Sequence, residues 1–215
     1  RLAVHAGEIV GVCGVEGNGQ QELAELITRR GAETLPPGAL AYIPADRQRE
    51  GLVLEMSLSE NIHLRQPLSR RVAGIAVLQA CEMEQRSSSL LTAYGVVPPQ
   101  AELPAHALSG GNQQKVVLAR ELSRNPKFIL AVNPTRGLDV GAAEEVHRRL
   151  LHAAREQKAA VLLISSDLDE ALLLADRLTV LYRGRLSEVG SRGVSKKAVG
   201  EAMVGASSKG SGVRG

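Results

Sequence analysis

The stretch GVEGNGQQ, residues 14–21, has the glycine spacing of a loop that binds phosphate. Glycines allow the backbone to turn its N–H groups inward, and the start of a following helix adds a favourable dipole for an anion. Gln20 stands where such a loop carries a lysine, and Gln21 stands where it carries a serine or threonine. A tight strand-to-helix turn without a ligand explains the glycines of this stretch equally well.

A second candidate anion site is LSGGNQQK, residues 108–115. Ser109, Gly110 and Gly111 precede a segment that opens with polar residues and then turns apolar, which indicates a helix start. Exposed backbone amides and a hydroxyl at that position can bind an anion. A plain N-cap turn is the alternative for SGG alone, whereas the full run of residues is more specific.

Two apolar runs end in polar residues that could face a phosphate. FILAVNPTRGLDVGA, residues 128–142, runs from an apolar strand into a turn, and VLLISSD, residues 161–167, does the same. In phosphate-loop ATPases the first of these strands ends in a magnesium-binding Asp followed by a catalytic Glu. Val132 and Asn133 occupy those two places here. Taken singly, each run is more often a strand end than a site.

The elements that must position these residues alternate along the chain. We expect strands at 8–13, 40–44, 127–132 and 160–165, two short strands within 177–190, and helices at 20–30, 108–124, 141–157 and 167–176. Such alternation predicts an α/β layer structure with a mainly parallel sheet. The segment 57–107 interrupts this alternation of strands and helices. It opens with the capping-box pair Ser57 and Glu60, and the chain is predicted to be helical from there to about Leu108, with breaks at prolines. We therefore expect this segment to form a separate helical lobe.

Composition limits the class of protein. The chain has 215 residues, of which 44% are apolar, 23% charged and 2% aromatic, so one domain with an aliphatic core is expected. A net charge of +3 is too small to argue for nucleic acid as a partner. Cys13 and Cys81 lie in apolar surroundings and read as reduced core thiols of a cytoplasmic protein. No apolar run approaches the roughly 20 residues that span a bilayer, and no signal peptide is recognisable.

The two ends of the chain lead to different expectations. The chain lacks an initiator Met and opens close to a strand, so we read it as part of something longer. The tail ASSKGSGVRG, residues 206–215, is rich in Ser, Gly and Lys and is predicted to be disordered.

Together and in this order, the motifs resemble the ATP-binding cassette of membrane transporters, the ABC family. GVEGNGQQ is similar to its nucleotide loop, YIPADR to the segment around its glutamine loop, LSGGNQQK to its signature, NPTRGLD to its strand end and following loop, and LLISSD to its histidine-switch strand. The resemblance runs from Gly7 to about Gly205 and implies a P-loop NTPase core with a helical subdomain, so that residues 1–205 form one cassette. LSGGNQQK with PTRGLDVGA resembles the tandem-cassette ATPases of simple-sugar and nucleoside importers, and GNGQ resembles the C-terminal cassette of the nucleoside branch.

The resemblance assigns roles to particular positions. In this family two cassettes pair head to tail, and each nucleotide lies between the loop of one and the signature of the other. The positions at its own nucleotide would be Gly14, Glu16, Gly17, Asn18, Gly19, Gln20 and Gln21. The signature positions that would serve the partner's nucleotide are Leu108, Ser109, Gly110, Gly111, Asn112 and Gln113, with Asp139 at the dimer seam.

The departures from the family pattern fall on the catalytic positions. Amides replace the lysine and the magnesium-binding hydroxyl, and no charged residue remains at the expected catalytic places: Gln20, Gln21, Ala45, Val132, Asn133 and Ser166. The stretch 28–40 is also short for the small β-subdomain usual there. No catalytic residue is intact and no metal ligand is expected, so ATP and Mg²⁺ would act mainly at the partner's site.

The resemblance implies a cassette of an importer for simple sugars or nucleosides. Its partners would be a second cassette, N-terminal on the same full-length chain, transmembrane permease subunits, and indirectly a periplasmic or lipoprotein solute-binding protein. It would lie at the cytoplasmic face of the cell membrane, with no nucleic acid partner. A regulatory cassette that senses nucleotide without driving transport is the alternative, and a soluble cassette acting in DNA repair or translation is a third reading without supporting insertions.

Overall fold

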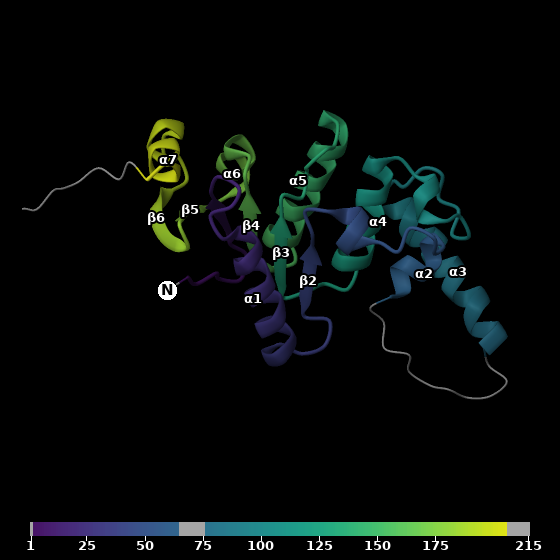
Figure 1. Ribbon diagram of the computed structural model, residues 1–215. Helices are drawn as coiled ribbons and strands as arrows, with labels where there is room; N and C mark the ends of the chain where they lie inside the picture. Colours follow the sequence, from purple (N-terminus) through teal and green to yellow (C-terminus); the bar gives the residue numbers. More distant parts are fainter. Residues whose placement is uncertain (1, 65–75, 206–215) are drawn as a thin grey trace, which may run out of the picture.

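A single twisted sheet forms the centre of the molecule (Figure 1). The computed structural model describes residues 2–64 and 76–205, except for the side chains of 76–82. In that part of the chain the strand order is β2-β3-β4-β1-β5-β6, with parallel pairing throughout except between β5 and β6. The strands are β1 (Ile9–Cys13), β2 (Leu40–Ile43), β3 (Phe128–Val132), β4 (Ala160–Ser165), β5 (Arg177–Tyr182) and β6 (Arg185–Ser191). This mainly parallel sheet with helices confirms the predicted α/β layer structure.

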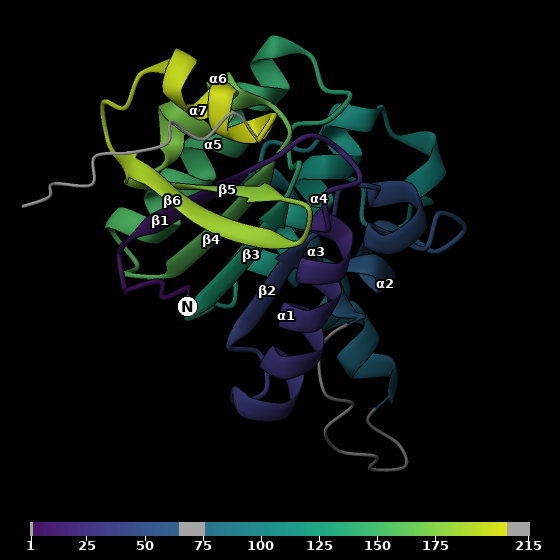
Figure 2. The same cartoon turned by 60° about the vertical axis from the view of Figure 1, so that its left-hand side comes forward.

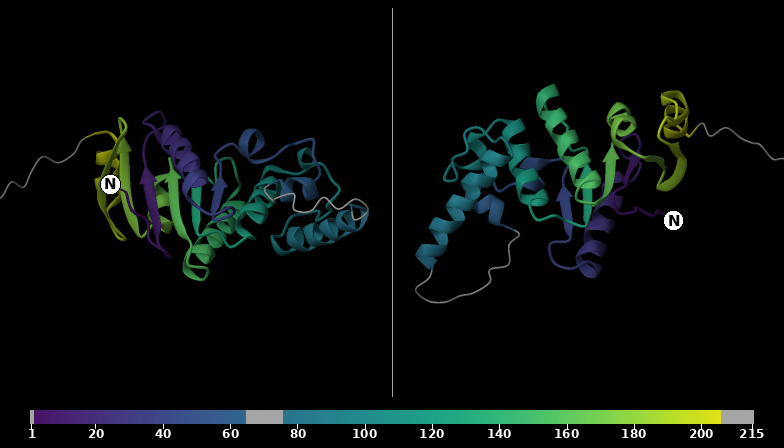
Figure 3. Two further views of the ribbon diagram at one scale, coloured as in Figure 1. Left: turned by 90° about the horizontal axis from the view of Figure 1, so that it is seen from below. Right: turned by 180° about the vertical axis from the view of Figure 1, so that it is seen from behind.

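Helices cover both faces of this sheet. They are α1 (Gln20–Thr34), α2 (Leu58–His63), α3 (Ala76–Ala93), α4 (Gly110–Leu122), α5 (Val140–Arg155), α6 (Leu168–Leu174) and α7 (Lys196–Met203), with a π-helical turn η1 (Arg47–Gly51) and a 3₁₀ turn η2 (Ala105–Ala107). Figure 3 shows α1 and α5 on opposite sides of the sheet. The connections therefore have the layered α/β arrangement that buries both faces of parallel strands.

The central strands are apolar at nearly every position because both of their faces are buried. Successive side chains of a strand point to opposite faces. Val10 of β1 packs in one cluster with Ala24 of α1. Its neighbour Ile9 belongs to the second cluster, which contains Val116 of α4 and Leu150 of α5. The runs IVGVC, FILAV and AVLLIS thus form strands between two apolar layers.

The expected elements are largely confirmed, with several differences. The helix expected at 20–30 continues to Thr34. The stretch up to Leu108, expected to be helical, is wrong beyond α3, because the chain from 94 to 104 forms turns and bends. Prolines there lack the N–H that a helix needs. The π-helical turn η1, of five residues, and the helix α7, of eight residues, were not predicted.

The helices α2 and α3 lie beyond the β2 edge of the sheet, as Figure 1 shows. The predicted capping box is present, because Ser57 Oγ accepts from Glu60 N at 3.1 Å and Glu60 Oε2 accepts from Ser57 N at 2.8 Å. The fully buried Asn61 accepts from Val53 N and donates to Val53 O, both at 2.9 Å. These bonds fix the start of α2 against the chain that leaves η1.

The thiol of Cys13 is a core group rather than a reactive one. Its side chain is fully buried at the end of β1. Burial, and to a smaller extent the nearby carboxylate of Asp167, raises the pKa of the Cys13 thiol to about 12. A thiol with so high a pKa does not act as a nucleophile at neutral pH. The side chain of Cys81 and the tail 206–215 lie outside the described residues.

Asp176, between α6 and β5, joins three elements. Arg155 at the end of α5 donates to both carboxylate oxygens, at 2.6 and 2.9 Å, and Ile9 N at the start of β1 donates at 2.9 Å. The Asp176 main-chain carbonyl accepts from Arg192 N at 2.9 Å. Burial opposes the charged form of Asp176, but the hydrogen bonds from Arg155 and Ile9 outweigh it and hold the pKa of that carboxyl below its ordinary value.

We predict that Asp176→Asn lowers the free energy of unfolding at pH 7 by about 1.5–3 kcal/mol, the range for hydrogen bonds to a charged group. Because the pKa in the folded protein is lowered, this stabilisation is fully present above the unfolded pKa of about 4 and is lost as the pH falls through the folded value. Urea unfolding of the natural protein and of Asp176→Asn, from pH 7 down to about pH 3, should therefore show a difference in the free energy of unfolding that becomes smaller only at the acid end. Asp169→Asn, which removes an exposed pair with Lys196, is the control and should change stability by less than about 1 kcal/mol. A difference in the free energy of unfolding that stays constant with pH would contradict the lowered pKa of Asp176.

Candidate functional site

The loop between β1 and α1 has the backbone of an anion-binding turn. Gly17 and Gly19 have φ angles of 87° and 110°, in the left-handed region that favours glycine. Gly19 is the N-cap of α1, and no side chain satisfies the first N–H groups of that helix. A Cβ on Gly14 would lie 2.7 Å from Leu181 O, so the loop can pass the sheet only with glycine there. The predicted order of strand, glycine loop and helix is present.

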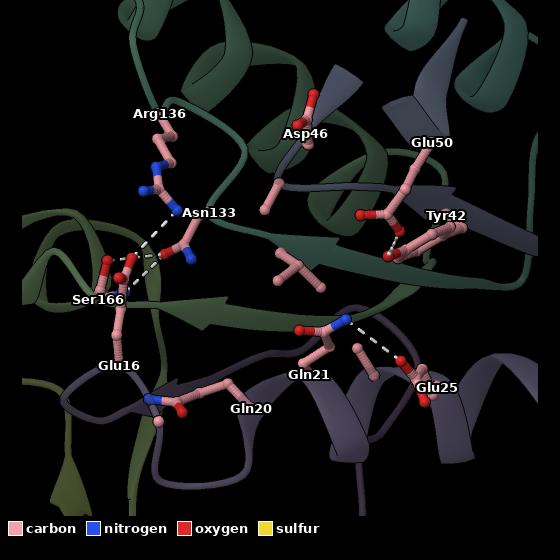
Figure 4. A pocket seen from close by; sticks show the side chains of 14 residues that line it. Glu16, Gln20, Gln21, Glu25, Tyr42, Asp46, Glu50, Asn133, Arg136 and Ser166 are labelled. Carbon is pink, nitrogen blue, oxygen red and sulfur yellow. Dashed lines mark hydrogen bonds and ion pairs between the residues drawn. The ribbon is translucent and has the colours of Figure 1, made fainter. Parts of the chain in front are cut away.

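The side chain of Gln20 folds back into this loop. Its Nε2 donates to Val15 O at 2.8 Å, and its Oε1 accepts from Asn18 N at 3.1 Å. Figure 4 shows the carboxamide lying along the loop. The amide oxygen thus takes one of the N–H groups that such a loop offers to a phosphate.

The hairpin between β5 and β6 braces the loop from the other side. Asn18 Oδ1 accepts from Arg183 N at 3.0 Å, and Asn18 O accepts from Gly184 N at 3.0 Å. Figure 2 shows this hairpin beside the end of β1. Sequence reasoning did not identify this support, because the hairpin is remote in the chain and its turn carries no motif.

A cavity of about 350 Å³ opens beside the loop, and Figure 4 shows the side chains around it. Its lining residues are Glu16, Gly17, Gln20, Gln21, Ala24, Glu25, Tyr42, Ala45, Asp46, Glu50, Val132, Asn133, Arg136 and Ser166. The structure therefore brings most of the predicted loop positions together with the predicted strand ends. Four carboxylates and a single guanidinium in this lining give a formal charge of −3, which opposes the entry of a polyphosphate.

The strand ends that face the cavity are joined to each other. Asn133, which follows β3, has a left-handed φ of 40°. Its Oδ1 accepts from Ser166 N at 2.7 Å and from Ser166 Oγ at 3.0 Å. Val132 before it is apolar and 6% exposed. The two positions expected to hold a catalytic Glu and His thus bond to one another with neutral groups.

The cavity does not fit a magnesium ion. Gln21 Nε2 donates to Glu25 Oε1 at 3.3 Å, so its amide points along α1. Val132 offers no oxygen from its side chain. Within residues 2–64 and 76–205 no cluster of three or more His, Cys, Asp or Glu side chains could hold a metal. The backbone amides fit phosphate in part, whereas the four carboxylates of the lining do not gather, in the described part of the chain, into a cluster that could hold Mg²⁺.

The second predicted anion site lies on a different surface. Ser109 is the N-cap of α4 and is exposed, and its Oγ accepts from Asn112 Nδ2 at 3.1 Å. Gly111 and Asp139 line a groove of about 600 Å³ that also contains Lys115 and Glu145. Asp139 caps α5 by accepting from Ala142 N at 2.8 Å. The start of α4 and the start of α5 therefore face the same groove.

Not all predicted signature positions face outward. Gln113 is 2% exposed, and its Nε2 donates to Ala105 O at 3.1 Å. Leu108 is also buried. Asn112 accepts from Val97 N at 3.0 Å, so it holds the chain that precedes η2. Ser109 is exposed and the two glycines are half-buried, while the buried Leu108 and Gln113 support them from within.

A buried carboxylate that sequence reasoning missed lies behind the strand ends. Glu170 of α6 is 4% exposed. It accepts from Ser165 Oγ at 2.7 Å and from Thr135 Oγ1 at 2.8 Å, and His147 Nε2 lies 3.0 Å away. Only tertiary packing joins these four residues. They fix the loop after β3 to the end of β4.

Comparison with known proteins agrees with this arrangement. The family model described as ABC transporter matches residues 1–136. The chain is 40% identical to the guanosine import ATP-binding protein NupO of Bacillus subtilis (strain 168) and 38% identical to the nucleoside import ATP-binding protein NupA of Lactococcus lactis subsp. cremoris (strain MG1363). These alignments cover 97% and 95% of this chain but 44% of each relative. The chain thus spans less than half the length of the curated relatives it matches.

Solved structures support the fold independently. The dimeric structure of the ATP-binding cassette MJ0796 bound to ADP and Pi superposes with a TM-score of 0.72 at 22% identity, over 90% of this chain and 89% of that chain. The chain therefore belongs to the ABC transporter family, as an ATP-binding cassette close to those of nucleoside and sugar import ATPases.

Proposed function

We propose that this cassette is the C-terminal member of a pair in the ATP-binding component of a nucleoside or simple-sugar importer. Its own phosphate site is degenerate, and its signature completes the ATP site of the partner cassette. The observation that carries the proposal is the contrast between two anion sites. The Ser109 start of α4 is exposed and intact, whereas Gln20 fills the loop before α1.

The degenerate state of the loop follows from the lost charge. A lysine at position 20 would add a hydrogen bond from a charged group, a contribution of about 1.5–3 kcal/mol, or about 10- to 100-fold in affinity. The glycine backbone remains, so weak binding of ATP is retained. Hydrolysis needs a positioned water and a metal, and removing even one positioned group costs ~10²–10³ in rate. With neutral groups at Asn133 and Ser166 this cassette is nearly silent by itself.

The signature would act on the nucleotide of the partner. Ser109 with Gly110 and Gly111 would contact its γ-phosphate, since only glycine permits close approach of the backbone N–H groups. Asp139 lies beside Gly111 at 3.9 Å from the position of a Cβ there, and would meet the partner at the dimer seam. ATP and Mg²⁺ would therefore be held mainly by the partner's loop.

The assembly proposed for this cassette follows from its relatives. Curated relatives are named for the import of guanosine, nucleosides and ribose, which supports an importer of nucleosides or simple sugars with permease subunits and, indirectly, a solute-binding protein. No helix in residues 2–64 and 76–205 is long and apolar enough to cross a bilayer, and we propose a peripheral position on the cytoplasmic side. We further propose that residues 1–205 form the cassette and that its segment 57–107 contacts the permease.

We predict that the isolated chain has no ATPase activity above background. A phosphate-release assay with MgATP is the measurement. The single change Asn133→Glu, which returns one carboxylate, should leave it silent, because Val132 and Gln21 still provide no metal ligand. A magnesium-dependent turnover near 1 s⁻¹, within the ordinary enzyme range, would contradict the degenerate state.

We predict that the chain binds ATP with a dissociation constant of about tens of micromolar or weaker, and that Gln20→Lys tightens it by about 10- to 100-fold. The new ammonium replaces a carboxamide that competes for Asn18 N. Isothermal titration calorimetry measures both values. Gln21→Lys is the matched control, since it adds the same charge to a side chain directed at Glu25, and it should change the affinity by less than about threefold. Equal gains from both would show only a general charge effect.

The two anion sites should respond differently in the complete polypeptide with its permease. Ser109→Arg places volume and charge where the partner's γ-phosphate must dock, so ATPase activity and transport should collapse. Gln20→Ala removes a neutral amide from a nearly silent site, so activity should fall by less than about tenfold. ATPase assays and solute uptake in vesicles measure both. The proposal fails if Gln20→Ala abolishes turnover while Ser109→Arg leaves it intact.

A further inference from the structure

The guanidinium of Arg47 lies between the signature and the loop after β3. Its Nη1 donates to Arg136 O at 3.0 Å. A Cβ on Gly110 would collide with Arg47 Nη2 and would lie 3.3 Å from Cζ. A methyl group on Gly110 would therefore have to push the end of the Arg47 side chain aside, so the guanidinium packs against Gly110.

The interactions of Arg47 within its own chain leave much of its guanidinium unpaired. Its Nε is buried without a hydrogen-bond partner. Within residues 2–64 and 76–205 the guanidinium forms no ion pair, and the adjacent Asp46 instead caps the N–H groups of Gln48 and Arg49 at 3.0 and 3.1 Å. A cation beside a helix N-terminus is also unfavourable with respect to the helix dipole. Both the positive guanidinium and the start of α4 would be satisfied by an anion that docks on Ser109.

Neighbouring residues of η1 reach both anion sites. Asp46, the N-cap of η1, lines the cavity beside the glycine loop. Gln48 Nε2 donates to Gln113 Oε1 at 3.0 Å, inside the signature helix. The short segment after β2 thus connects the cavity to the supporting side of the signature, with Arg47 between them.

We propose that Arg47 is a positioning residue for the nucleotide of the partner cassette. It holds Gly110 and the loop after β3 in one arrangement and adds positive charge behind the exposed N–H groups of the signature. The ligand is the terminal phosphate of a nucleoside triphosphate bound to the partner's loop. This inference rests on the proposed function, in which the signature serves the partner.

The test uses the complete polypeptide assembled with its permease. Arg47→Ala should lower the kcat of ATP hydrolysis by about 10- to 100-fold, because a small misplacement of a positioning group has effects of that size. The KM for ATP should change by less than about threefold, since the partner's loop supplies most of the binding contacts. Arg47→Lys should not restore the rate, because an ammonium cannot bond Arg136 O and also lie flat on Gly110.

The matched control is Arg49→Ala on the same turn. The side chain of Arg49 is 88% exposed and lies 3.7 Å from Asp46, so its loss should change kcat by less than about twofold. Thermal unfolding of each variant tests for a fold defect. If Arg47 acted only through stability, its loss would lower the melting temperature and leave the kcat of the folded protein unchanged.

Gly110→Ala completes a double-mutant cycle. The added methyl meets the Arg47 guanidinium only in the natural background, so Gly110→Ala should lower kcat in both backgrounds, through the phosphate contact, but by a smaller factor when Arg47 is already Ala. Ser109→Arg separates the two proposals. If Ser109→Arg leaves ATPase activity intact, the proposed function fails. If Ser109→Arg abolishes activity but Arg47→Ala stays within twofold of the natural protein, or if the Arg47 and Gly110 effects multiply, the role of Arg47 is overturned alone.

Discussion

Parallel pairing of β1, β3 and β4 is the constraint on which the candidate site depends. Parallel strands bring their carboxyl ends to one edge, so the loop after Cys13, the turn after Val132 and the turn after Ser165 must meet there. Both faces of the strands are buried, which fixes their register through two separate apolar clusters. Ligand-facing residues can therefore change at the strand ends while the scaffold stays the same.

At that edge, side-chain amides and a hydroxyl bond to one another and to the backbone. Gln20 closes the glycine loop on itself, and Asn133 accepts from both donors of Ser166. Neutral hydrogen bonds of this kind stabilise the folded state modestly and do not require a ligand. Because these groups pair without a ligand, they agree with the proposal that the cassette keeps the shape of a nucleotide site but does not hydrolyse ATP at it.

The signature has the opposite character. Ser109 is exposed at the start of α4. Two buried side-chain amides hold that helix in place: Gln113 Nε2 donates to Ala105 O at 3.1 Å, and Gln114 Nε2 donates to Pro134 O at 2.9 Å. Arg47 supplies a positive charge that its own chain does not neutralise within the described residues. A helix start with a guanidinium nearby suits an anion, which agrees with the proposal that the signature serves the nucleotide of a partner.

The sequence by itself determined the strands, the glycine loop, the signature helix and the family, because apolar periodicity and motif order are local properties. IVGVC, FILAV and AVLLIS could only be buried strands, and LSGGNQQK could only open a helix. Tertiary structure decided what the polar groups do. That Gln20 fills its loop is a choice of rotamer against nearby backbone, whereas that Gln113 points inward and that Arg47 reaches Gly110 are contacts between different elements. Such contacts depend on how helices dock on the sheet, and no spacing within one segment encodes them.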